Sequence, residues 1–183
     1  MEGPRLRAAG PGDAARLLAL KKDLDRETSF MLLEPGERRE NRSDVAADLA
    51  YVANQVNAIV IVAEMAGQLV GYAEARGGRY RRSRITAYVV IGVLAAARGR
   101  GIGAGLLRGL ELWAPAHGIH RLELTVMAHN RRAFELYRRM GYTVEGRRRE
   151  CLIVDGCLAD ELYMAKLLNT EGHAEHGTRH PGR

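Results

Sequence analysis

The sequence has few cysteines and no long hydrophobic run. Its two cysteines, Cys151 and Cys157, stand six positions apart, which matches neither a CxxC redox motif nor a zinc pair and cannot build a disulfide framework. No apolar stretch approaches the roughly 20 residues needed to cross a bilayer, and residues 1–20 lack the uninterrupted apolar core of a signal peptide. These absences predict a soluble, cytoplasmic protein that does not associate with a membrane.

Lysine is also scarce, because only Lys21, Lys22 and Lys166 are lysines among 28 basic residues. The formal net charge at pH 7 is +6, and this arginine surplus favours anionic partners such as phosphates, nucleic acid or an acidic cofactor. With 46% hydrophobic and 27% charged residues, the 183-residue chain has an ordinary globular composition and about the length of one domain. We expect a single domain over residues 1–168 and a flexible tail over residues 169–183.

Hydrophobic periodicity predicts a mixture of strands and helices. Residues 58–65 and 69–75 are rich in aliphatic residues on either side of a turn, which indicates a hairpin. Residues 85–93 are almost continuously apolar, which is typical of a strand buried on both faces. Together these patterns predict an α/β (α+β) sheet layered with helices. Helices are expected at about 13–26, 45–55 (with Ser43 as N-cap), 103–116 and 130–140, further strands at 6–8, 121–126, 142–145 and 158–167, and a loop at 76–84.

A glycine-rich turn, RGRGIGA over residues 98–104, joins the apolar strand to the next helix. Glycine permits a positive φ and leaves room for a ligand, and the start of a helix offers unpaired N–H groups to a phosphate. Arg98 and Arg100 add charge for phosphate oxygens. A Walker motif is absent, and a dinucleotide-binding fold is disfavoured because about five residues separate the strand from the first glycine. The turn therefore predicts a phosphorylated ligand.

Two motifs together resemble the GNAT superfamily of N-acetyltransferases. The first is Arg98-x-x-Gly101-x-Gly103, and the second, 27 residues later, is N-x-x-A-x-x-L-Y-x-x-x-G-Y, beginning at Asn130. The resemblance covers about residues 58–167. It implies a central mixed, mostly antiparallel, splayed sheet flanked by helices. It also implies acetyl-CoA as co-substrate and transfer of the acetyl group to a primary amine by direct attack within a ternary complex.

The resemblance also implies roles for individual residues. Tyr137 would protonate the departing thiolate, a role that suits a phenol of pKa about 10. A backbone N–H near Val93 or Leu94 would stabilise the oxyanion. The residues expected to bind the co-substrate are Ile91, Gly92 and Val93 along the pantetheine arm, Arg98, Gly99, Arg100, Gly101, Ile102, Gly103 and Ala104 at the pyrophosphate, and Asn130 and Ala133 at the start of the next helix.

The base that accepts the proton of the amine is not evident. The strand at residues 85–93 carries no acid, and Thr125 occupies the position where some relatives have glutamate. Glu123, two residues earlier on the same face, is the nearest substitute and our candidate catalytic carboxylate. Glu34 and Glu74 are further candidates, placed with the acceptor substrate. For each of the three, a surface or structural role is the alternative.

Other interpretations remain at this stage. The protein is alternatively a catalytically silent acyl-CoA-binding relative, or a nucleic-acid-binding module that uses the arginines of residues 76–84 and 147–149. The latter is disfavoured because aromatic residues are not interleaved with these arginines. No carboxylate or cysteine completes a metal site with His173, His176 and His180 near the C-terminus, so we expect no metal. The expected partner is a small-molecule or peptide amine, and a homodimer is compatible with the sequence.

Overall fold

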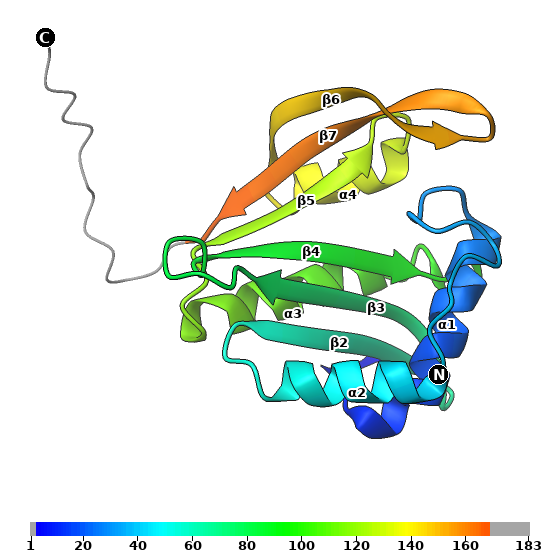
Figure 1. The fold of residues 1–183 in the computed structure, drawn as a ribbon, viewed down its shortest axis with the longest axis vertical. Coiled ribbons are helices and arrows are strands. Elements are labelled where there is room, and N and C mark those ends of the chain that lie inside the picture. Colours follow the sequence, from blue (N-terminus) through cyan, green and yellow to red (C-terminus); the bar gives the residue numbers. More distant parts are fainter. Residues whose placement is uncertain (1–2, 169–183) are drawn as a thin grey trace, which may run out of the picture.

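The computed structural model describes residues 3–168, which form one seven-stranded sheet with helices on both faces (Figure 1). The strand order is β1-β2-β3-β4-β5-β7-β6, and every neighbouring pair is antiparallel except β4 and β5. This confirms the expected fold class, whereas the expected tail lies outside the described residues. The strands are β1 (Arg5–Ala8), β2 (Ala58–Met65), β3 (Gln68–Gly77), β4 (Thr86–Val93), β5 (Arg121–Met127), β6 (Thr143–Val154) and β7 (Cys157–Leu167). The helices are α1 (Ala14–Glu27), α2 (Arg42–Ala53), α3 (Ile102–Ala116) and α4 (Arg131–Arg139), with short 3-10 turns at Pro11–Asp13 and Ala95–Ala97.

Alternation along the strands divides the core into two layers. On β2, Val60 and Val62 pack with the apolar faces of α1 and α2. The residues between them, such as Ile61, point to the opposite face and pack with α3. Successive strand residues point to opposite faces, so a strand covered by helices on both sides must be apolar throughout.

The sheet splits between β4 and β5. Their parallel ladder has only three register pairs and ends at Tyr88 and Glu123, after which the two strands diverge (Figure 1). Beyond that point β4 pairs only with β3, and β5 pairs with β7. One edge of β4 therefore faces a gap. The expectation that β4 is buried on both faces is wrong for Tyr88, whose side chain is exposed in this gap.

Two element boundaries differ from expectation. Helix α2 begins at Arg42, and its N-cap is Asn41, whose side chain accepts hydrogen bonds from the N–H groups of Ser43 and Asp44. Ser43, the expected cap, lies inside the first turn. Strand β6 runs on to Val154, well beyond the expected end at residue 145, because β7 pairs with it as far as Val154, with register shifts between Val144 and Gly146 and between Arg148 and Leu152.

The hairpin of β2 and β3 is confirmed, although β3 extends to Gly77 and so includes the start of the expected loop at residues 76–84. Within residues 3–168, no helix combines the length and the apolar character that a membrane span requires.

Candidate active site

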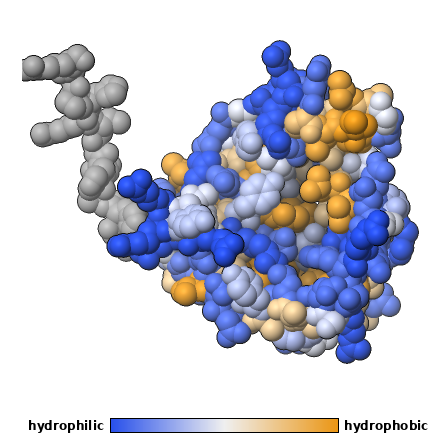
Figure 2. All heavy atoms as spheres, in the orientation of Figure 1, coloured by the Kyte–Doolittle hydropathy of each residue, from blue (hydrophilic) through white to orange (hydrophobic). Residues whose placement is uncertain are grey.

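A cavity of about 740 Å³ occupies the gap between β4 and β5. Figure 2 shows a hollow on this face, with apolar side chains around it on an otherwise largely hydrophilic surface. One part of the wall is the glycine turn with α3 and α4. The other part is formed by the segment after α1, by Tyr88, and by the sheet of β5, β7 and β6. Its residues include Thr28, Phe30, Met31, Leu32, Thr125, Met127, Arg148, Leu152 and Glu161, and we call this part the acceptor side.

The glycine turn has the geometry of an anion site. Gly99 and Gly101 have φ of +78° and +76°, a region that favours glycine, and a Cβ built on either would meet no atom within 4 Å. Gly101 is the N-cap of α3, and its carbonyl accepts the N–H of Gly105 at 2.9 Å. The N–H groups of Ile102, Gly103 and Ala104 therefore have no acceptor within the helix. The open space and these donors fit the diphosphate of coenzyme A.

The two arginines of the turn have different positions. Arg98 lines the cavity, and its Nε donates to the carbonyl of Val93 at 3.1 Å, which leaves its two Nη groups for a ligand. Arg100 is exposed and is not part of the cavity wall. The structure thus brings Arg98, but not Arg100, together with the rest of the expected co-substrate residues.

The edge of β4 offers main-chain groups to the gap. The N–H of Leu94 donates to the carbonyl of Val70 at 3.0 Å, so the main-chain N–H of Leu94 points toward β3. By the alternation of an antiparallel ladder, the N–H groups of Ile91 and Val93 point the other way, into the gap. Val93 therefore stays the candidate oxyanion donor, and Leu94 is wrong for that role. Gly92 serves packing, because a Cβ there would lie 2.6 Å from Cδ1 of Leu24 on α1.

Helix α4 begins and ends at the residues of the second motif. The Asn130 side chain caps the helix by accepting the N–H of Ala133 at 3.1 Å, and its amide NH₂ is left to donate. Tyr137 lines the cavity and is buried, 7% exposed. Burial raises the pKa of the Tyr137 phenol well above its usual value, and the nearby Tyr88 raises this pKa further. Tyr137 is therefore a protonated group throughout the neutral range.

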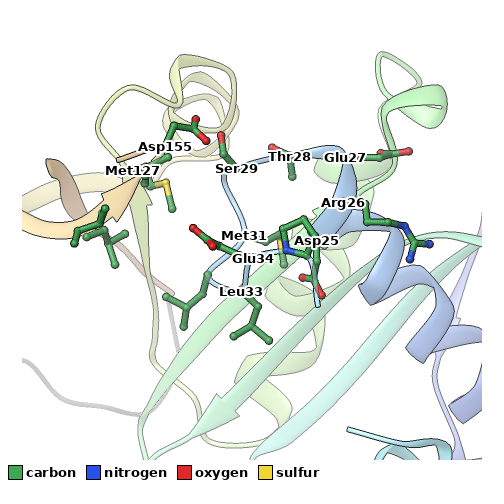
Figure 3. Close-up of a pocket in the computed structure, with 15 residues that line it drawn as sticks. Asp25, Arg26, Glu27, Thr28, Ser29, Met31, Leu33, Glu34, Met127 and Asp155 are labelled. Carbon is green, nitrogen blue, oxygen red and sulfur yellow. The ribbon is translucent and has the colours of Figure 1, made fainter. Parts of the chain in front are cut away.

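The three expected carboxylates are not brought together. Glu123 accepts from Arg121 Nε at 2.8 Å and is not part of the cavity wall. Glu74 lies between Lys21 and Arg76, also away from the cavity. Glu34 lines a second cavity of about 470 Å³, which shares Thr28, Met31, Leu32, Met127 and Leu152 with the first. Figure 3 shows Glu34 directed into the space between the segment after α1 and the other wall, where Met127 lies on β5 and Asp155 lies in the turn between β6 and β7.

A hydrogen-bonded group on the acceptor side was missed by the sequence analysis. The Tyr88 hydroxyl lies 2.8 Å from Thr125 Oγ1, which donates to Glu161 Oε1 at 2.9 Å. Arg148 Nη1 donates to the other carboxylate oxygen at 2.7 Å. The one available signal was the pair of acids Asp160 and Glu161 in the last strand, and the proximity of Glu161 to Thr125 depends on the strand order.

The segment that walls the acceptor side is tied to the turn after β4. Glu27, the last residue of α1, accepts the N–H of Ala95 through Oε2 at 2.8 Å. Residues 28–34 then leave α1 without a regular helix or strand. Phe30 contacts the ring of His129, just before α4, at 5.2 Å between ring centroids. Both sides of the gap are therefore bridged by this segment.

Comparisons with known proteins agree with this architecture. Residues 20–142 match the Acetyltransferase (GNAT) family. The chain is 29% identical over 142 residues to an L-methionine sulfoximine/L-methionine sulfone acetyltransferase of Pseudomonas paraeruginosa, which covers 77% of this chain and 81% of that protein. A GNAT acetyltransferase from Streptococcus pneumoniae superposes with a TM-score of 0.87 at 28% identity, covering 91% of this chain and 99% of that one. The yncA protein of Salmonella typhimurium, solved with acetyl-CoA, superposes with a TM-score of 0.82 at 21% identity, covering 92% of this chain and 95% of that one.

A splayed sheet with a glycine turn suited to an anion at the start of a helix is typical of acyltransferases that use a coenzyme A thioester. Within this class, the match over residues 20–142 shows that the chain belongs to the GNAT family of acetyltransferases. It is an acetyl-CoA-dependent N-acetyltransferase. The acetyltransferase relatives favour this activity over a catalytically silent acyl-CoA-binding protein and over a nucleic-acid-binding module. Among residues 3–168, no group of three or more His, Cys, Asp or Glu side chains is placed to hold a metal ion.

Proposed function

We propose that this N-acetyltransferase acetylates the α-amino group of a small amino acid that keeps a free carboxylate. The observation that carries this assignment is the position of Arg148 in the wall of the acceptor side. Its Nη1 donates to Glu161, whereas Nε and Nη2 have no hydrogen-bond partner among residues 3–168. A guanidinium with two free nitrogens suits the bidentate binding of a carboxylate.

The rest of the acceptor side suits such a substrate. Phe30, Met31, Leu32 and Leu152 supply apolar surface for a side chain, and Tyr88 and Glu161 supply oxygens for an ammonium group. The relative from Pseudomonas paraeruginosa acts on L-methionine sulfoximine and L-methionine sulfone, which are amino acids of this size. A peptide N-terminus would lack the adjacent carboxylate that Arg148 is positioned to bind.

The co-substrate residues have the roles that the motifs imply. The N–H groups from Gly99 to Ala104 and the Arg98 side chain bind the diphosphate, and the main-chain edge at Ile91 and Val93, with the Asn130 amide, binds the pantetheine arm. Gly92 and Ala133 line the same cavity but contribute by packing and by capping. Arg100, outside the wall, adds only long-range charge at the turn. The bound co-substrate supplies the acetyl thioester.

Tyr137 acts as the acid. The neutral amine forms a bond to the acetyl carbonyl carbon, the carbon–sulfur bond breaks, and the Tyr137 hydroxyl gives its proton to the departing sulfur. The nitrogen, which carries one proton more than an amide after the attack, releases that proton to the Tyr137 oxygen and so restores the hydroxyl. The N–H of Val93 donates to the oxyanion. Because burial raises its pKa, Tyr137 holds this proton throughout the neutral range.

The decisive experiment compares acceptors that differ only in the carboxylate. Release of free thiol from acetyl-CoA is measured with L-methionine sulfone, with the matching amine that lacks the carboxylate, with an alanine-initiated peptide and with spermidine. We expect turnover with the amino acid and a KM at least about 10-fold higher for the decarboxylated amine, since a charge-assisted pair contributes about 1.5–3 kcal/mol. In Arg148→Gln this difference between acceptors disappears.

A preference for the peptide or for spermidine would contradict the assignment, and so would an unchanged difference in Arg148→Gln. Arg138→Gln is the matched control, because Arg138 pairs with Glu135 on the exposed face of α4. Action in the cytoplasm and assembly as a homodimer stay predictions, to be checked by fractionation and by light scattering.

A further inference from the structure

Glu161 is a buried carboxylate in the wall of the reaction cavity. Its side chain is 12% exposed, and it comes from β7, two strands away from β4. Oε1 accepts the Thr125 hydroxyl at 2.9 Å, and Oε2 accepts Arg148 Nη1 at 2.7 Å. Cys151 Sγ lies 3.7 Å from Oε2. These contacts and Tyr88, which reaches Glu161 through Thr125, are the titratable and charged groups that face it.

The hydrogen bonds fix the direction of the hydroxyl protons. A threonine hydroxyl has one proton, and Thr125 gives it to Glu161, which as a carboxylate can only accept. The bond between Thr125 and Tyr88 must then use the Tyr88 proton, at 2.8 Å. Tyr88 therefore presents only lone pairs to the cavity. A group in this state can accept a hydrogen bond from an ammonium but cannot donate one.

We infer that Tyr88, Thr125 and Glu161 form a proton relay that deprotonates the acceptor amine, with Glu161 as the final proton acceptor. An ammonium hydrogen bonded to Tyr88 Oη gives up its proton to that oxygen. The Tyr88 proton passes to Thr125 Oγ1, and the Thr125 proton passes to Glu161 Oε1. The products are a neutral amine, two unchanged hydroxyl groups and a carboxylic acid at Glu161, so the charges and protons balance.

The position of the relay matches the needs of the reaction. Tyr88 stands at the last register pair before β4 and β5 diverge, so its hydroxyl borders the gap where the main-chain edge of β4 is exposed. Tyr137, which holds the proton for the leaving group, lines the same cavity as Tyr88. One end of the site thus accepts a proton and the other end supplies one.

Glu123 is the competing candidate on the same face of the sheet. Tyr88 and Glu123 are register partners, but Glu123 accepts from Arg121 and makes no hydrogen bond to Tyr88 or Thr125 within residues 3–168. It is also outside the cavity wall. The hydrogen bonds thus favour Glu161 as the base.

The test measures kcat/KM against pH for Glu161→Gln, Thr125→Val and Thr125→Ser, with the affinity for CoA measured by calorimetry. At pH 7 we expect Glu161→Gln and Thr125→Val to lower kcat/KM about 100-fold, the lower range for loss of general base catalysis. The deficit should shrink as the pH approaches the pKa of the acceptor amine, because solution then supplies the neutral amine. Thr125→Ser, which keeps the hydroxyl, should retain most activity, and the affinity for CoA should be unchanged in all three variants.

Glu145→Gln is the matched control, a carboxylate on β6 that accepts from Arg121 and is not part of the cavity wall. A deficit that is equal at every pH would show a structural role and overturn the relay. So would full activity in Thr125→Val, or the same pH-dependent loss in Glu123→Gln instead of Glu161→Gln. If Glu161→Gln does not fold, Thr125→Val decides, since it removes no charge.

The relay deprotonates any ammonium acceptor, with or without a neighbouring carboxylate. Failure of the amino-acid assignment would alter the acceptor preference and the effect of Arg148→Gln, but not these pH profiles. Failure of the relay would alter the profiles but not the preference. The two outcomes are therefore distinguishable.

Discussion

The sharpest test of the co-substrate site is a bulky side chain at Gly101. A leucine there adopts φ near +76°, where an L-residue costs roughly 1–2 kcal/mol, but its Cβ meets no protein atom within 4 Å. The fold should therefore survive with a modest loss of stability. We expect the new side chain to fill part of the open space at the start of α3, where we propose that the diphosphate binds.

The expected loss of affinity follows from the donors that are blocked. Hydrogen bonds to a charged group contribute about 1.5–3 kcal/mol each, so displacing the diphosphate from two N–H groups costs about 3–6 kcal/mol. This corresponds to a roughly 150-fold to 20,000-fold weaker Kd for CoA. Calorimetric titration with CoA measures the affinity, and thermal denaturation measures the stability.

Gly118→Leu is the control for backbone strain. Gly118 follows the other end of α3, has φ of +71°, and would also place a Cβ in open space, but it is not part of the cavity wall. We expect both variants to lose similar stability and only Gly101→Leu to lose affinity. Equal affinities in the two variants, whether high or low, would refute the assignment of the diphosphate to this turn.

Two further predictions concern the acid and the N-terminal ion pair. Tyr137→Phe should lower kcat about 100-fold with little change in the Kd for CoA, and an unchanged kcat in stopped-flow or steady-state assays would remove the acid role. Because the pKa of Tyr137 is raised, its ionisation should cause no loss of wild-type activity between pH 6 and about pH 10. Asp13→Asn should lower the free energy of unfolding at pH 7 by about 1–3 kcal/mol, because Asp13 is buried and accepts hydrogen bonds from Arg7 at 2.7 and 2.8 Å. The guanidinium of Arg7 holds the pKa of Asp13 well below its usual value. The stabilisation is therefore present above the unfolded pKa of about 3.9 and is lost as the pH falls through the lower folded pKa. Denaturant titrations should show a smaller difference in the free energy of unfolding between variant and wild type at pH 3 than at pH 7, and a constant difference would contradict this cause.

Features set by local chemistry were predictable from the sequence. The glycine turn at residues 98–104 and the cap at Asn130 depend on backbone freedom and on a side chain bonding to its own helix, and both are in place. The boundary of α2 shows a finer signal, because Asn41 has Asp44 three residues later and completes a capping box, which Ser43 does not. An acid at the third position of the helix would have selected the correct cap.

Features set by strand order were not predictable in this way. Thr125 and Glu161 are 36 residues apart, and they meet only because β7 is inserted between β5 and β6. The arginines of β6 obscured that strand, since a basic run is typical of a solvated loop. In the fold, Arg147 Nε and Arg148 Nη1 donate to Asp160 and Glu161 on β7 at 2.6 and 2.7 Å, so acids on one strand match bases on the next. Hydrophobic periodicity carries no information about such pairs.

The irregular segment after α1, residues 28–34, is fixed at its start, whereas its side chains can be exchanged independently of the glycine turn. Glu27 fixes where residues 28–34 begin, at the N–H of Ala95, while the residues beyond it contribute mainly side chains to one wall. We expect an exchange of those side chains to change which amine is accepted, without disturbing the glycine turn to which we assign the diphosphate. Variants confined to residues 28–34 are therefore the first choice for changing the acceptor amine while the residues proposed to bind acetyl-CoA stay unchanged.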